Sequence, residues 1–258
     1  MTPTPVDLDS VELPVQYIEC NLMMAAFSAS AERLRHLTPE DLRIVELIPG
    51  RAALGIACFE YLDTSIGPYN ELAITWPVVA SRRRPPPLLP LLLETRWPRM
   101  GYWVHRLPVT TEIANQAGRA FFGYPKFLAD IEFAWQGATR TCTMREGGSE
   151  ILSLALDTWM PARPTRFPLY TYSVRGEELL RTRIDVDAVG IRRTGRGSAE
   201  LRLGPHRVGR ELAELDLRIA RPIEVRWFPV YRAILPEAQE RQPLASPFRF
   251  DPDVREAA

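Results

Sequence analysis

Lys126 is the single lysine of this chain, in which lysine and arginine together number 32 among 258 residues. Either side chain serves as a solvated positive charge. Only the amine can lose its proton and attack a carbonyl carbon, because guanidinium stays protonated at biological pH. The bias therefore makes Lys126 a candidate nucleophile that forms an imine with a ketone. The alternative is a surface lysine whose aliphatic stem covers an apolar neighbour.

The residues before Lys126 predict a stiff corner in the backbone. A helical pattern over Glu112 to Phe121 is followed by Gly123, a residue that commonly ends helices. Pro125 restricts Tyr124 to extended geometry, so the chain leaves the helix in a fixed direction. Aromatic neighbours predict burial of the amine, which favours its uncharged form. These neighbours are Phe121, Phe122, Tyr124 and Phe127.

The elements that must position this lysine are mostly strands. Runs rich in β-branched and aromatic residues predict strands at Val15 to Ala26, Ala52 to Tyr61, Leu72 to Ala80, Tyr102 to Leu107, Ile131 to Trp135, Ile151 to Thr158 and Pro222 to Leu235. Helical pattern is confined to Ala31 to Leu37, Glu112 to Phe121 and Val208 to Leu215. Strands and helices do not alternate, and no internal repeat is present. We therefore expect an α+β fold with a mainly antiparallel, strongly curved or closed, barrel-like β-sheet and a few short helices.

The chain is expected to form a single domain over residues 1–258. The proline- and glycine-rich stretches 81–90 and 190–197 are not followed by a change in composition. Stretch 190–197 has the glycine spacing of a phosphate loop, but Arg196 and Gly197 stand where that motif needs lysine and then serine or threonine. We predict a hairpin turn there. Residues from about 237 onward, rich in proline, are predicted to form an irregular tail.

Composition excludes several classes of function. The 32 acidic residues balance the 32 basic ones, so no nucleic acid is expected as a partner. The longest apolar stretch, 85–93, is short and interrupted by prolines, and the N-terminus lacks a signal-peptide pattern, so no membrane segment is expected. The histidines lack metal-ligand spacing, and no metal is predicted. Three separated cysteines predict buried free thiols in a reducing cytoplasm, namely Cys20, Cys58 and Cys142.

Two segments carry a resemblance to a known family. Gly118-Arg119-Ala-Phe-Phe-Gly-Tyr124-Pro125-Lys126 resembles the Gly-Arg-Glu-x-x-x-Tyr-Pro-Lys-Lys segment of the acetoacetate decarboxylase family. Lys126 takes the place of the lysine that forms the imine in that family. Asp63-Thr-Ser-Ile-Gly-Pro-Tyr-Asn-Glu71 resembles a stretch that ends in an active-site glutamate. The resemblance implies the family's fold, a catalytic Lys126, Glu71 as general acid or base, and no metal or organic cofactor.

Departures from the family pattern bear on the substrate. Phe127 replaces the family's second lysine, and Ala120 replaces the glutamate after Gly-Arg. These apolar replacements predict a substrate larger or more apolar than acetoacetate. Arg119 is a candidate to bind a substrate carboxylate through its planar guanidinium. The alternative is an arginine near a helix end that pairs locally or faces solvent. Further substrate contacts are expected from the aromatic residues Phe122, Tyr124 and Phe127.

The residues and the resemblance together predict a Schiff-base-forming carbon–carbon lyase that acts on a keto acid or ketone. Decarboxylation of a larger, more apolar β-keto acid in specialised metabolism is the leading hypothesis. An aldolase-dehydratase or a cyclase on the same fold is the first alternative. A non-catalytic ligand-binding member, in which Lys126 only donates a hydrogen bond, is the second. Family members assemble from several copies, so a homo-oligomer with a small-molecule keto ligand is expected.

Overall fold

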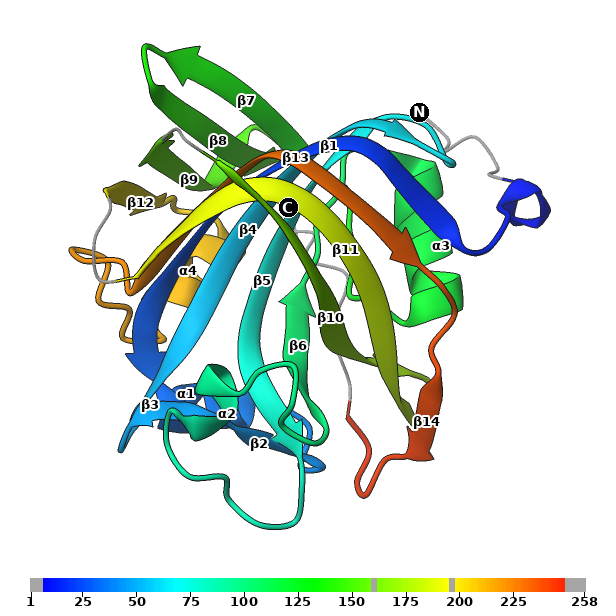
Figure 1. Ribbon diagram of the computed structural model, residues 1–258, viewed down its shortest axis with the longest axis vertical. Helices are drawn as coiled ribbons and strands as arrows, with labels where there is room; N and C mark the ends of the chain where they lie inside the picture. The colour runs from blue at the N-terminus through cyan, green and yellow to red at the C-terminus, as the bar shows by residue number, and fades with distance from the viewer. Residues whose placement is uncertain (1–6, 159–161, 195–197, 249–258) are drawn as a thin grey trace.

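Seven strands close into a barrel in the computed structural model, which describes residues 7–158, 162–194 and 198–248 (Figure 1). Around the barrel the order is β5-β6-β10-β11-β13-β1-β4, and β4 pairs with β5 to close it. Neighbours are antiparallel except β6 and β10. The predicted closed antiparallel sheet is thereby confirmed. The barrel strands are β1 Val15–Ser30, β4 Arg51–Thr64, β5 Tyr69–Ala80, β6 Met100–Arg106, β10 Arg163–Arg175, β11 Glu178–Thr194 and β13 Glu224–Leu235.

Shorter elements surround the barrel. β2 (Leu42–Ile44), β3 (Glu46–Ile48) and β14 (Glu240–Pro243) extend it at β5, β4 and β11. A second antiparallel sheet lies against one side of the barrel (upper left in Figure 1), with the strand order β12-β9-β8-β7. Its strands are β7 Asp130–Gln136, β8 Thr139–Glu146, β9 Ser149–Asp157 and β12 Ala199–Leu203. The helices are α1 Ala31–His36, α2 Leu89–Leu92, α3 Glu112–Phe122 and α4 Arg207–Ala213, with a 3-10 turn at Leu8–Ser10.

Strands β1, β4 and β5 are buried on both faces, which explains their nearly continuous apolar sequences. Alternate residues point to opposite sides of a strand. On β5, Leu72 and Ile74 face a compact cluster between the barrel and the second sheet, which we call the outer core. Ala73 faces the second cluster, the barrel interior. The barrel thus separates two apolar regions that are built from the same strands.

All seven predicted strands and all three predicted helices are present. The short strands β2, β3, β12 and β14 and helix α2 were not predicted, and neither were the longer strands β8, β10 and β11. β11 alternates inward Thr182, Val186 and Ala188 with outward arginines and aspartates. The outward charges interrupt the β-branched runs that served as the strand signal. β10 also contains prolines, which lower a strand prediction. β10 and β11 were therefore missed because only one face of each strand is buried.

Two predictions about irregular structure were wrong in part. Residues 190–194 belong to β11 and form no turn, while 195–197 lie outside the described residues. Gly190 is needed because a Cβ there would lie 2.1 Å from Cδ1 of Phe228 on the neighbouring strand. The tail predicted from about 237 contains β14, which pairs with β11, and Leu244 and Phe248 pack on the outer core. Backbone pairing and apolar burial therefore order the described part of this tail.

The three cysteines are free and buried, as the sequence predicted. Within the described ranges, no helix is long and apolar enough to cross a membrane.

Candidate active site

The end of α3 fixes where the chain turns toward Lys126. Gly123 has a φ of 60°, in the left-handed region that favours glycine, and it ends the helix. The amides of Gly123 and Tyr124 donate hydrogen bonds to the carbonyls of Arg119 and Gly118, at 3.2 and 3.1 Å. These bonds satisfy carbonyls that the helix leaves free. The corner that the sequence predicted is present.

The segment around Lys126 is held in extended form. The amides of Leu107 and Val109 donate to the carbonyls of Pro125 and Phe127, at 3.1 and 2.9 Å. Since side chains alternate along an extended segment, Lys126 and Phe127 point to opposite sides. Lys126 faces the barrel interior, where it is only 4% exposed. Phe127 packs in the outer core.

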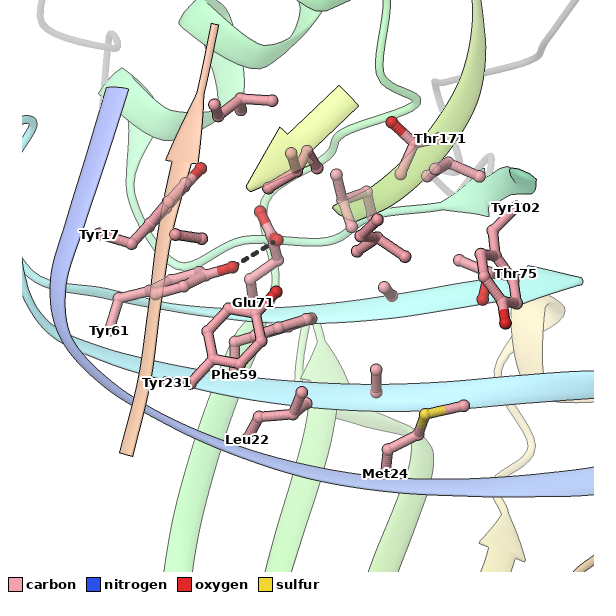
Figure 2. Close-up of a pocket in the computed structure, with 18 of the residues that line it drawn as sticks. Tyr17, Leu22, Met24, Phe59, Tyr61, Glu71, Thr75, Tyr102, Thr171 and Tyr231 are labelled. Carbon is pink, nitrogen blue, oxygen red and sulfur yellow. Dashed lines mark hydrogen bonds between the residues drawn. The ribbon is translucent and has the colours of Figure 1, made fainter. Parts of the chain in front are cut away.

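Lys126 and Glu71 meet inside the barrel although 55 positions separate them in the sequence. Lys126 Nζ donates a hydrogen bond to Glu71 Oε2 at 2.7 Å, and both side chains are almost fully buried. The hydroxyl of Tyr61 donates to the other carboxylate oxygen, Oε1, at 3.2 Å (Figure 2). Each oxygen of the carboxylate therefore has a donor, as a buried charge requires. This buried ion pair is the chemical centre of the barrel.

Gly118 makes room for the lysine side chain. A Cβ at this position would lie 2.4 Å from Lys126 Cδ and 2.5 Å from Lys126 Cε. Such contacts are far shorter than any van der Waals separation, so the aliphatic stem runs directly against the backbone of α3. Gly118 belongs to the Gly-Arg motif of the sequence. The close contact with Lys126 explains why a glycine stands at this position of the motif.

A group of tyrosines that was not predicted from the sequence, Tyr17, Tyr61 and Tyr69, lies around the ion pair. Burial, and then the nearby negative charge of Glu71, raises the pKa of Tyr17 and of Tyr61 well above the usual range. Both therefore stay neutral and keep their hydroxyl protons. Tyr69 donates to Tyr17 at 3.3 Å, and Lys126 Nζ lies 5.5 Å from the Tyr69 ring centre. The alternation of aromatic residues along β4 could have predicted these tyrosines, because Phe59 and Tyr61 lie two residues apart and share the face that lines the cavity.

The ion pair opens onto a cavity that holds about 980 Å³ of space between its walls, the opening included. Figure 2 shows Tyr17, Tyr61 and Glu71 at one end of it and Tyr102 with Thr75 at the other. Most of the lining between them is apolar. The apolar members are Leu22, Met24, Ala57, Phe59, Ala73, Val104, Leu107, Phe167, Leu169, Ile184, Phe228, Ala233 and Leu235.

Of the predicted substrate contacts, only Tyr124 lines this cavity, and its hydroxyl is 2.8 Å from that of Thr171. Arg119 is exposed on α3, because one helical step turns it away from the face that Gly118 presents to Lys126. Phe122 is buried beside Tyr124, with ring centres 5.7 Å apart, but it does not line the cavity. Phe127 faces the outer core. The predicted placement of these three residues at the substrate is therefore corrected.

No group of three or more histidine, cysteine, aspartate or glutamate side chains is placed to hold a metal ion among the residues described. The polar groups at the cavity are an amine, a carboxylate, several neutral phenols, two threonine hydroxyls and the guanidinium of Arg226.

The chain belongs to the acetoacetate decarboxylase family, whose pattern matches residues 2–231. This membership places it among lyase-type enzymes. No curated protein matches the chain.

Solved structures share the fold at low sequence identity. Acetoacetate decarboxylase from Legionella pneumophila subsp. pneumophila str. Philadelphia 1 is 16% identical, with a TM-score of 0.67 over 95% of this chain and 92% of that one. An acetoacetate decarboxylase-like enzyme from Sphingomonas wittichii RW1 is also 16% identical, with a TM-score of 0.62 over 94% and 98%. The enduracididine biosynthesis enzyme MppR is 13% identical, with a TM-score of 0.62 over 91% and 90%.

Proposed function

We propose that this protein forms a protonated imine between Lys126 and a keto acid and uses it to break the bond to the substrate carboxylate. One observation carries the proposal. The sole lysine of the chain is buried at an apolar cavity, with its amine 2.7 Å from Glu71 Oε2. A lysine kept for solubility would face water, and a purely structural ion pair needs no cavity beside it.

The first half of the reaction makes the imine. Lys126 transfers a proton from Nζ to Glu71 Oε2, and the free amine attacks the ketone carbon. A second proton moves from the nitrogen to the oxygen to give a neutral carbinolamine. Glu71 returns the proton to the carbinolamine oxygen, which leaves as water, and a protonated imine remains. The Tyr61 hydroxyl holds the carboxylate in position for both transfers. The neighbouring phenols keep their protons, so they add no second negative charge.

The second half uses the imine as an electron sink. The bond between the α-carbon and the carboxylate breaks, its electron pair moves into the enamine, and carbon dioxide leaves. A proton then returns to the α-carbon, and water hydrolyses the imine to release the ketone and the amine of Lys126. Arg226 is the other cationic residue of the lining, and it is already paired with Glu224. A substrate carboxylate near Lys126 therefore meets few stabilising charges, which favours its loss.

Aldol chemistry is the second candidate. A structure of MppR holds the condensation product of pyruvate and imidazole 4-carboxaldehyde. The same enamine can attack an aldehyde carbon in place of taking up a proton.

Trapping of the imine tests the proposal. The protein is incubated with acetoacetate, longer β-keto acids or pyruvate, reduced with borohydride, and digested for mass spectrometry. We expect the adduct on the Lys126 peptide and none in Lys126→Arg. Arg119→Lys is the matched control, because it adds an exposed lysine seven positions away that should stay unlabelled. Absence of any adduct on Lys126 across the panel would overturn the proposal and favour a non-catalytic ligand-binding role.

Product analysis separates the two reactions. Carbon dioxide released from β-keto acids supports decarboxylation, whereas a condensation product from pyruvate and an aldehyde, without carbon dioxide, supports aldol chemistry.

A further inference from the structure

The cavity at Lys126 adjoins a second chamber. Met24, Thr75, Tyr102 and Arg226 line both spaces and form a waist between them. The second chamber holds about 720 Å³ of space between its walls, the opening to solvent included, and its lining is mainly apolar. Its roof includes Leu88, Leu91 and Leu92 at helix α2, which lies at the end of the barrel near β3 (Figure 1).

Small residues keep the path between the two chambers free of side chains. Strand register stacks the barrel interior in layers, and the layer of Glu71, Phe59 and Leu22 holds the catalytic carboxylate. In the next layer Ala73 and Ala57 are paired, beside Met24. In the layer after that Thr75 is paired with Gly55, beside Ala26. Larger residues at the alanine and glycine positions would fill the barrel, as β-branched residues do in packed barrels.

The waist has fixed walls and one adaptable side chain. The Tyr102 hydroxyl donates to Glu94 at 2.5 Å, and Arg226 is bound to Glu224. Met24 is unbranched, and methionine adapts readily to irregular space. A Cβ on Gly55 would lie 3.0 Å from Met24 Cε, so Met24 rests on the open backbone of this glycine. A shift of Met24 alone widens the passage.

The path is long compared with a four-carbon acid. Thr75 lies four residues beyond Glu71 on β5, a distance of about 13 Å at about 3.3 Å per residue. A zigzag chain with carbon–carbon bonds of about 1.5 Å needs about ten bonds to cover it.

We propose that the substrate is a keto acid with a linear apolar chain of about ten carbons or more. Its carbonyl binds at Lys126 and its chain passes the waist into the chamber beneath α2. The inference rests on the proposed imine chemistry and adds the substrate class. The apolar lining supplies the binding energy, because each buried methylene strengthens binding about threefold to fourfold.

Competitive trapping tests the substrate class. The protein is mixed with equal amounts of acetoacetate and 3-oxododecanoate and reduced with borohydride, and the two Lys126 adducts are quantified by mass spectrometry. We expect the long adduct to exceed the short one at least tenfold. Gly55→Leu places a side chain at the waist and should lower this ratio at least tenfold. Met24→Ala widens the same waist and should keep or raise the ratio of long to short adduct. General damage to the protein would not lower this ratio in one variant and keep or raise it in the other.

The outcomes are distinct. Adducts with acetoacetate but no preference for the long acid overturn the inference and leave the imine proposal standing. No adduct with either acid overturns both. Thermal unfolding checks that each variant is folded, and Ala53→Leu, which fills the far chamber instead, replaces Gly55→Leu if that variant does not fold. An unchanged ratio in the folded blocking variant also overturns the inference.

Discussion

The barrel interior and the outer core share strands β1, β4 and β5, yet they differ in content. On β5, Leu72 and Ile74 are fully buried in the outer core, where aliphatic side chains fill the space. On the opposite face of the same strand, Glu71, Ala73 and Thr75 border a cavity. A slip of one residue in register would exchange the two sets of side chains. Packing on one face therefore fixes the position of the chemistry on the other.

Two buried polar clusters extend this comparison. Glu71 binds Lys126 beside the cavity, whereas Glu211 on α4 binds His105 and Arg106 on β6. Burial alone would raise the pKa of Glu211, but the hydrogen bond and charge of His105, followed by those of Arg106, lower it to about 2. Glu211, His105 and Arg106 are not among the residues that line the Lys126 cavity. We interpret the Glu211 cluster as a structural link between α4 and strand β6 of the barrel.

The largest expected effect is that of Glu71→Gln, which removes the proton acceptor of Lys126. We expect the rate of adduct formation at Lys126 to fall about 10²- to 10⁴-fold, the usual contribution of general acid–base catalysis. Single-turnover trapping with borohydride measures this rate. An unchanged rate would show that the carboxylate only neutralises the amine.

Leu72 follows Glu71 on β5 and tests the face of this strand that points into the outer core. Leu72→Ala leaves a cavity in the outer core and should lower the free energy of unfolding by about 2–5 kcal/mol. Denaturant titration measures this loss, and trapping by the folded fraction should stay close to that of the parent protein. A large loss of trapping with little loss of stability would contradict the division between the two faces.

The Glu211 cluster should make the protein sensitive to acid. The pKa of Glu211 is about 2 when folded, against an ordinary value of 4.5. Its stabilisation, about 3 kcal/mol, is therefore complete above about pH 4.5 and is lost as the pH falls toward 2. Denaturant titrations across this range should show a smaller pH dependence for Glu211→Gln. Equal slopes for the variant and the parent protein would refute the assignment.

Gly118→Ala tests the steric fit of the lysine. On an open helix the change would stabilise by about 1 kcal/mol. Here the new methyl group would displace the stem of Lys126, and an error of about 1 Å in position can cost about 10²-fold in rate. Trapping rates should fall accordingly, while Ala120→Ser, an exposed change on the same helix, should trap as the parent protein does. Equal rates in both variants would show that the lysine adapts.

Tyr61→Phe should have the smallest effect. It removes one hydrogen bond to the Glu71 carboxylate, and such bonds to charged groups contribute about 1.5–3 kcal/mol. We expect trapping to slow at least tenfold. Tyr124→Phe removes a hydroxyl that is paired with Thr171 instead, so its loss should be smaller. The reverse order of the two effects would remove Tyr61 from the proton-transfer step.

Much of the fold was predictable because its signals are local. Apolar runs at β1, β4 and β5 identified strands that are buried on both faces, and Gly123 with Pro125 identified the corner before Lys126. β11 was missed because its outward arginines and aspartates hide the alternation. The tail at 240–243 was missed because pairing with β11, a distant segment, is what orders it. The candidate site shows the same division. Lys126, Glu71 and Tyr124, which line the cavity, were named from local motifs, but Tyr17 and Tyr61 were not.

The sequence by itself determined which residue is the amine, where the backbone turns before it, and which family the motif resembles. These properties depend on residue type and on neighbours along the chain. Only the tertiary structure decided that Glu71 reaches Lys126, that Arg119 faces water, and that Phe127 faces the outer core. Barrel closure sets which face of each strand points inward, and closure depends on pairing between strands far apart in the sequence.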